Sequence, residues 1–213
     1  MIARQHGPRE RLEWLAFSRC FAQSTISPLL VLSLVLSLIL ASAVTSFAAH
    51  AAALTEYEIK AGFFFNFTRF VEWPEDAFAT PTSPIVACVM GETPLTDPLA
   101  ELTQGKVVNG RAVSINLVKP SDDLRRCNLL FISEAAARRT GEVLARLRKA
   151  NTLTVGETPG FPLAGGMINF AILDNKVKLE INLDATTRAG LKVNSKLIAV
   201  SRLVSSNSVA EDN

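Results

Sequence analysis

The sequence predicts a single α/β domain, with a largely parallel β-sheet flanked by helices and an antiparallel hairpin near the C-terminus. Short apolar segments such as IVACVM (85–90) alternate with segments of helical periodicity, a pattern typical of buried parallel strands joined by helices. Near the C-terminus, KVKLEINLD (176–184) instead alternates apolar and polar residues. It follows Asp174-Asn175, a pair that tolerates the positive φ of a tight turn, so a hairpin is expected there.

The chain opens with a segment that is typical of a secretory signal peptide. Four arginines precede an apolar run from Leu29, and small residues lead to a cleavage pattern at Ala49-His50-Ala51. We therefore expect residues 1–51 to be a long leader that is cleaved on export, and residues 52–204 to form the mature domain. The alternative is an uncleaved anchor, because the apolar run is long enough to cross a membrane.

Cleavage would change the composition of the chain. The leader holds four arginines and two glutamates, so a chain of net charge +2 becomes formally neutral, which gives no electrostatic case for nucleic acid or anionic lipid. It also holds both histidines, His6 and His50. Without histidine, a Ser-His-Asp triad and a histidine-bearing metal site are excluded. We therefore predict no catalytic residue, metal or cofactor.

The mature domain is expected to begin with a helix. Phe63, Phe67 and Phe70 share one face of this helix, which we expect to be core, and Pro74 is expected to end it. Further elements follow in order: strands at 85–90, 112–118, 129–133 and 153–155, helices near 95–103 and 134–150, the hairpin within 165–184, a final helical region at 185–204, and a flexible polar tail at 205–213.

The C-terminal part is predicted in more detail from its alternation. In the second arm of the hairpin, Val177, Leu179, Ile181 and Leu183 are expected to point inward, and Lys178, Glu180, Asn182 and Asp184 outward. In the final helical region, Leu197, Val200 and Val204 are expected to pack on the sheet.

Two cysteines remain after the leader, which contains Cys20. Cys88 and Cys127 each lie in or beside an apolar strand, and an even pair in an oxidising compartment favours a disulfide. The alternative is two buried free thiols that behave as small apolar side chains.

Motifs that would indicate an enzyme are weak. GETPGFPLAGG (156–166) is rich in glycine, but it lacks the Gly-Lys-Ser/Thr ending of a phosphate loop and contains two prolines, so we interpret it as a tight loop before the hairpin. Acid pairs such as Glu56/Glu58 could take part in acid–base chemistry, but nothing in the sequence places them in a cleft. The sequence favours a binding protein over an enzyme.

Two surfaces are candidates for binding a partner or ligand. Asn66, Arg69 and Trp73 share a face of the first helix, and Trp and Arg are enriched where interfaces concentrate their energy. The alternative is a structural role, with Trp73 half-buried and Arg69 over its ring. The second surface is polar and lies at the exit of the hairpin, where a solvated face is the alternative. It comprises Glu180, Asn182, Arg188, Lys192 and Asn194.

Segments along nearly the whole mature chain resemble the YfiR family of periplasmic regulatory proteins. They are YEIKAGFFFNFTRFVEWP (57–74), IVACVMG (85–91), GRAVSINLV (110–118), CNLLFIS (127–133), TLTVGETPGF (152–161), GGMINF (165–170) and KVKLEINLDATTRAGLKVNSKLIAVSRLV (176–204). The resemblance implies an α/β domain, a tendency to form homodimers, and a disulfide between Cys88 and Cys127. A second cysteine pair near the hairpin, present in the best-known member, is missing between Gly156 and Phe170.

The resemblance also implies a function and a place in the cell. The best-known member restrains a membrane-bound diguanylate cyclase in the inner membrane by contacting its periplasmic portion, and an outer-membrane-linked partner relieves it. We therefore expect a regulator in the periplasm of a Gram-negative bacterium that acts in c-di-GMP signalling and biofilm formation. Two other classes stay open: a small-molecule sensor acting with another membrane partner, and an exported hydrolase that uses carboxylates alone.

Overall fold

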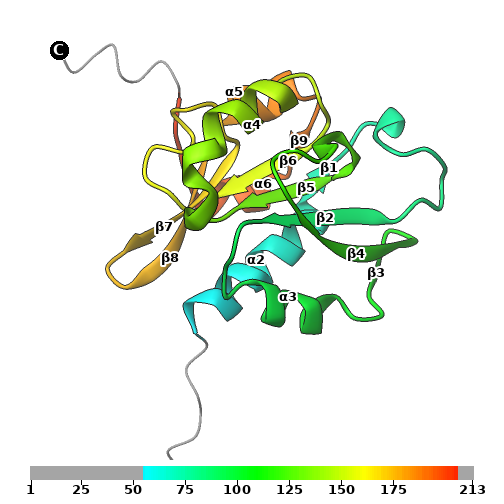
Figure 1. The fold of residues 1–213 in the computed structure, drawn as a ribbon, viewed down its shortest axis with the longest axis horizontal. Coiled ribbons are helices and arrows are strands. Elements are labelled where there is room, and N and C mark those ends of the chain that lie inside the picture. The colour runs from blue at the N-terminus through cyan, green and yellow to red at the C-terminus, as the bar shows by residue number, and fades with distance from the viewer. Residues whose placement is uncertain (1–54, 206–213) are drawn as a thin grey trace, which may run out of the picture. The chain divides into compact units, whose positions relative to one another are not determined.

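The computed structural model describes residues 55–205, and an eight-stranded sheet runs through them (Figure 1). The predicted leader (1–51) and all but the first residue of the predicted tail lie outside the described residues. In spatial order the strands are β10 (Ser201–Leu203), β8 (Lys176–Ile181), β7 (Ile168–Leu173), β6 (Leu153–Gly156), β5 (Leu129–Ile132), β2 (Ile85–Met90), β4 (Arg111–Val118) and β3 (Val107–Val108).

Most neighbouring strands of this sheet are parallel. Strand β7 pairs antiparallel with β8 through the turn at Asp174 and Asn175, whose φ values are positive, and β3 pairs antiparallel with β4. The predicted fold class is therefore confirmed: a mixed α/β domain with a mostly parallel sheet and an antiparallel hairpin near the C-terminus.

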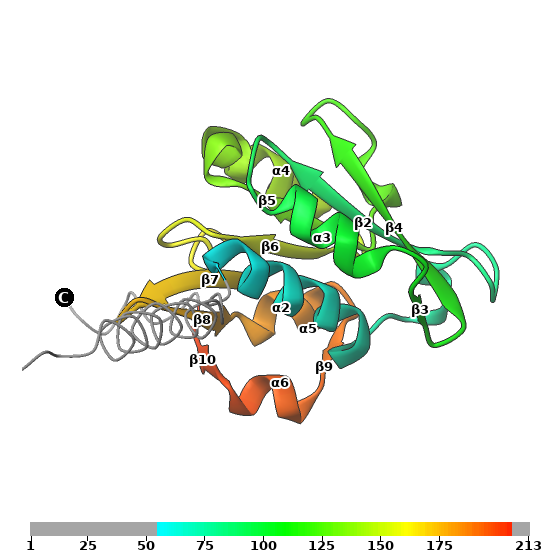
Figure 2. The same cartoon turned by 90° about the horizontal axis from the view of Figure 1, so that it is seen from below.

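Helices lie on both faces of the sheet (Figures 1 and 2). Helices α2 (Glu56–Phe70) and α3 (Thr96–Thr103) cover one face, and α4 (Thr140–Leu147), which follows the 3-10 helix η4 (Glu134–Arg139), covers the other. Alternate residues of the strands point to opposite faces, so the sheet carries a core on each side.

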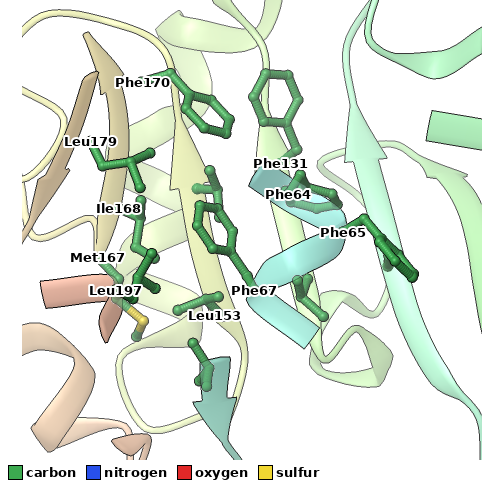
Figure 3. Close-up of a cluster of buried hydrophobic side chains, with 14 of the residues drawn as sticks. Phe64, Phe65, Phe67, Phe131, Leu153, Met167, Ile168, Phe170, Leu179 and Leu197 are labelled. Carbon is green, nitrogen blue, oxygen red and sulfur yellow. The ribbon is translucent and has the colours of Figure 1, made fainter. Parts of the chain in front are cut away.

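The core under α2 is rich in phenylalanine (Figure 3). The ring of Phe64 lies edge-on to that of Phe131 with 6.0 Å between centroids, and Phe67 stacks on Phe170 at the same separation. The expectation that Phe63, Phe67 and Phe70 form the buried face is correct only for Phe67. The other two are half-buried, because the face that α2 turns to the sheet centres on Ala61, Phe64 and Thr68, with Phe65 buried beside it.

The core under α4 is smaller and contains the disulfide. Cys88 on β2 and Cys127, just before β5, are bonded with their Cα atoms 5.8 Å apart, as the sequence led us to expect. Val143, Leu144 and Leu147 of α4 pack in this core, as the helical periodicity indicates. Closing a loop with a sequence separation of 39 residues is expected to stabilise the fold by about 4 kcal/mol in the chain-entropy model.

The predicted helical region at 185–204 is confirmed only in part, because two short strands interrupt and follow its helices. It contains α5 (Leu183–Arg188), β9 (Lys192–Val193), α6 (Ser195–Ala199) and the edge strand β10. Gly190, at φ 73°, terminates the first of these helices in the left-handed region that favours glycine. Leu197 is buried as predicted, but Val200 is 64% exposed, because the chain leaves α6 there to pair with β8.

The opening helix also ends earlier than predicted. It begins with a capping box in which Thr55 and Glu58 bond each other's backbone N–H groups. It stops at Phe70 rather than at Pro74, because Val71 and Glu72 form a short strand, β1, that pairs with β9. Within residues 55–205, none of the helices combines the length and apolarity needed to cross a membrane.

Candidate protein-binding site

The antiparallel pair of β1 and β9 brings parts of the two predicted surfaces together. Val71 lies opposite Val193 and Glu72 opposite Lys192, and the Asn194 N–H donates to the Phe70 carbonyl at 2.8 Å. The two valines face inward, whereas Glu72 and Lys192 are exposed. The pairing thus places Glu72 beside Lys192 although the two are more than a hundred positions apart. We use the name α2–β9 surface for Glu72 and the predicted residues of α2, of β9 and of the segments that follow them: Asn66, Arg69, Trp73, Lys192 and Asn194.

The last turns of α2 supply Asn66 and Arg69 to this surface. Arg69 is exposed, and its guanidinium lies 5.1 Å from the centroid of the Phe65 ring, not over Trp73 as the structural alternative held. Within the described residues, Arg69 has no carboxylate within 4 Å, so its charge is free to pair with a partner.

Trp73 lies at the base of the α2–β9 surface and is half-buried. Its indole N–H donates to the carbonyl of Asn128 at 3.2 Å, just before β5, and its ring packs against the core under α2. Asn128 in turn accepts from the Val86 N–H with its side chain at 2.9 Å. Trp73 therefore holds the end of α2 on the sheet, and only its remaining exposed edge can contact a partner.

The β9 side of the surface contributes exposed polar groups. Lys192 points outward and has no carboxylate within 4 Å among residues 55–205. Asn194 caps α6 by accepting from the Lys196 N–H at 2.9 Å, which leaves its amide nitrogen at the surface. Opposite charges on Glu72 and Lys192 lie across the ladder from each other, so the surface presents both signs.

Arg188 lies apart from the α2–β9 surface. It lines a groove of about 370 Å³ between α4 and α5, together with Arg148 and Thr154. Two guanidinium groups at one groove attract a small anion such as a carboxylate or phosphate. Within the described residues, no cluster of His, Cys, Asp and Glu could hold a metal ion.

Glu180 and Asn182 do not point outward, so that expectation is wrong. Asn182 is 0% exposed: it caps α5 by accepting from the Ala185 N–H and donates to the carbonyl of Pro162 at 2.8 Å. Glu180 is 7% exposed, pairs with Arg202 on β10, and accepts from Asn169 on β7 at 3.1 Å. Glu180 and Asn182 are therefore buried and serve the fold, and of the residues predicted to point outward only Lys178 and Asp184 are exposed.

Sequence reasoning missed a buried ion pair at the other end of α2. Lys60 is 3% exposed, and its ammonium lies 2.7 Å from a Glu157 oxygen and 2.5 Å from a Glu56 oxygen. The other Glu157 oxygen accepts from the Glu134 N–H at 3.1 Å. This cluster joins α2, the loop after β6 and the start of η4. The only sequence signal is a lysine inside an otherwise apolar turn.

The pKa shifts at this cluster follow from burial and charge. Burial lowers the pKa of Lys60, but its hydrogen bonds to Glu157 and Glu56 and their charges outweigh burial, so that the pKa is raised above its ordinary value. The pKa of Tyr57, whose ring centroid lies 4.6 Å from the Lys60 ammonium, is also raised, through burial and then the charge of Glu157.

A comparison with the curated proteins found no match, whereas a comparison with protein families agrees with the resemblance seen in the sequence. A family model described as YfiR/HmsC-like matches residues 57–202, which include both disulfide cysteines, the Lys60–Glu157 pair and the α2–β9 surface. This family is regulatory rather than catalytic, and membership points to a periplasmic regulator of c-di-GMP signalling. Because the match spans well over half of its length, the chain belongs to the YfiR/HmsC-like family.

Proposed function

We propose that the mature chain is a periplasmic regulator that binds and restrains an inner-membrane signalling protein, with a diguanylate cyclase as the partner. The observation that carries the proposal is the family match over 57–202. In this account the chain contacts the periplasmic portion of the cyclase, so that c-di-GMP synthesis and biofilm formation fall. An outer-membrane-linked protein that competes for the chain would relieve the restraint.

The α2–β9 surface is the docking site in this proposal. Its exposed Arg69 and Lys192 lack ion partners among the described residues, while Glu72 supplies the opposite sign beside them. Charges that find no partner in the fold can be desolvated against complementary charges on another protein, which favours specific and fast association. The exposed edge of Trp73 adds an aromatic contact of the kind that concentrates binding energy.

A binding function also fits what the fold does with its other polar groups. Lys60, Glu157, Glu180 and Asn182 are buried and paired with groups of the chain itself. Buried, fully paired groups of this kind hold a fold together, and they are not poised to bind and turn over a substrate. We therefore propose no enzymatic activity.

The groove between α4 and α5 favours a second candidate function, in which a small anion bound near Arg148 and Arg188 adjusts the contact with the partner. The chain would then be a sensor as well as a regulator. Binding of a carboxylate or phosphate compound that is lost in Arg188→Ala, with partner binding kept, would separate this role from docking.

A capture experiment from the membrane fraction of its own cell tests the main proposal. Tagged protein purified from the periplasm is mixed with detergent-extracted membranes, and the bound proteins are identified by mass spectrometry. We expect a membrane protein with a diguanylate cyclase domain to be enriched, and c-di-GMP to rise in cells that lack the chain. Unchanged c-di-GMP in such cells, with no membrane protein enriched, would contradict the proposal.

A further inference from the structure

Four arginines from three elements surround the C-terminal end of α4. Arg146 lies in the last turn of α4, and Arg148 follows its last residue. Arg125 belongs to the 3-10 helix η3 (Leu124–Arg126), and Arg188 ends α5. All four are exposed, and we call them together the arginine face.

Two grooves beside α4 show that these arginines are neighbours. Arg125 and Arg146 line a groove of about 260 Å³ between η3 and α4. Arg148 and Arg188 line the groove of about 370 Å³ between α4 and α5. Leu147 lines both grooves, so the two pairs of arginines lie on either side of the end of α4.

The charges of the arginine face are not neutralised within the part of the chain that the structure describes. There, none of its four arginines has a carboxylate within 4 Å. Asp123, the one acidic residue among those described that line either groove, pairs with Arg126 at 3.3 Å. Because charges at physiological salt act over only about 8 Å, acidic residues elsewhere do not cancel this cluster. The arginine face is therefore locally positive, although the expected mature chain is formally neutral.

The chain itself holds the centre of the arginine face in place. The Arg146 guanidinium donates to the carbonyls of Pro120 and Asp122, the latter at 2.8 Å. A guanidinium has five N–H donors, so others are left for an external acceptor. The macrodipole of α4 favours basic residues at its own end, but it does not explain Arg125, which η3 brings there.

We propose that the arginine face binds the phosphate groups of an anionic phospholipid membrane. Guanidinium groups bind phosphate oxygens through paired hydrogen bonds as well as through charge. Four cations spread over two grooves fit a surface of repeated phosphates, whereas a single small anion would contact only some of them. Among the described residues that line these grooves none is aromatic, so the face lacks the contacts that concentrate binding energy in protein interfaces.

This contact would hold the chain at the membrane in which its proposed partner lies. Helix α2 covers the opposite face of the sheet from α4, so a protein bound to α2 does not compete with lipid for the arginine face (Figure 2). Confinement to the membrane surface raises the effective concentration of the chain near a membrane protein. The lipid contact does not depend on the identity of that protein.

Co-sedimentation with lipid vesicles tests the proposal. Protein purified from the periplasm is mixed with vesicles of phosphatidylcholine alone, or of phosphatidylcholine and phosphatidylglycerol in equal parts. The test variant is Arg125→Gln/Arg188→Gln, which changes one arginine of each groove and leaves α4 intact. The matched control is Lys106→Gln/Lys178→Gln, which removes the same charge from exposed lysines just before β3 and on β8.

We expect the wild-type protein and the control to bind the phosphatidylglycerol vesicles, less tightly as salt rises, and not to bind phosphatidylcholine alone. The test variant should bind about 25-fold more weakly with an unchanged melting temperature, because each basic residue near an anionic surface contributes about fivefold to binding. Glycerol 3-phosphate, added at the concentration of the accessible lipid phosphate, should leave the protein on the vesicles.

Three results would overturn the proposal. The first is no binding to phosphatidylglycerol vesicles, or equal binding to phosphatidylcholine alone. The second is an equal loss of binding in the test variant and the control, which would mean that net charge rather than the arginine face decides. The third is release by glycerol 3-phosphate, which would make the grooves a site for a free small anion.

Discussion

The two ends of α2 carry charge in different ways. In its first turns, Lys60 is buried and bonds to Glu56 and Glu157, so its charge is matched inside the domain. In its last turns and the adjoining strands, Arg69, Glu72 and Lys192 are exposed, and the described residues place no ion partner within 4 Å of any of them. The charge at the first end is used within the fold, whereas the charges at the other end are exposed and can contact a partner.

The difference indicates which charges to substitute in order to separate stability from binding. A buried charge that loses its partner leaves an uncompensated group in a poorly solvated place, which is costly. An exposed charge without a partner contributes little to folding but can contribute to association.

The largest loss of stability is expected from Lys60→Met. The substitution leaves the Glu157 carboxylate buried without its cation, so the free energy of unfolding should fall by about 3–5 kcal/mol. Chemical denaturation measures it, with Lys149→Met, an exposed lysine after α4, as the control that should stay within about 0.5 kcal/mol of wild type. A loss below about 1 kcal/mol in Lys60→Met would mean that the buried pair does not hold this end of α2.

A comparable loss of stability is expected from removing the disulfide, which lies away from both ends of α2. Cys88→Ser should lower the free energy of unfolding by about 2–5 kcal/mol, because it frees the loop to Cys127 in the unfolded chain. The same denaturation experiment under oxidising conditions measures it. In the presence of a strong reductant, the free energy of unfolding of the wild-type protein should fall towards that of the variant. Equal wild-type stability with and without reductant would contradict the structural role of the disulfide.

Alkaline pH should weaken the buried end selectively. The pKa of Lys60 is raised in the folded chain, so its contribution is complete below the pKa of the unfolded lysine, about 10.4, and is lost as the pH rises through the folded value. The raised pKa of Tyr57 acts in the same direction. Wild-type stability should therefore fall above about pH 10 more steeply than that of Lys60→Met. If the stability of the two proteins fell equally steeply with pH, the assignment of this loss to Lys60 would be contradicted.

A smaller loss of stability is expected from Trp73→Phe, just after the C-terminal end of α2. The change keeps an aromatic ring but removes the N–H that bonds to the Asn128 carbonyl, which still accepts from Leu153. The free energy of unfolding should fall by about 1 kcal/mol, the usual net value of one such hydrogen bond. A melting curve that superimposes on that of wild type would show that Trp73 does not fasten this end of the helix.

The sequence predicted the elements whose signals are local. Strands β2, β5 and β6 are short apolar runs, and the β7–β8 hairpin is marked by its turn pair, so these could be located without a structure. Strands β1, β9 and β10 are two or three residues long and exist only because distant segments pair with them. No local pattern marks such strands, and the final region was therefore predicted as helical.

The same limit explains the errors at the candidate site. Glu180 is buried because β10 lies beside β8 and provides Arg202, and the prediction of a helix there left Glu180 facing solvent. Lys60 and Glu157 are 97 positions apart, so their pairing leaves no trace in either segment alone. The exposed Arg69 and Lys192 were selected correctly as surface residues, but the pairing of β1 with β9, which joins the segment after α2 to the segment of Lys192, could not be seen in the sequence.

The most direct test of the account is the affinity of the captured membrane partner's periplasmic portion for variants of the exposed end. Arg69→Ala and Lys192→Ala should each leave the melting temperature nearly unchanged and weaken binding about tenfold or more, whereas the matched control Lys149→Ala should bind like wild type. Isothermal titration calorimetry measures all three. Wild-type affinity in both surface variants, with the fold intact, would contradict the claim that this end of α2 is the docking site.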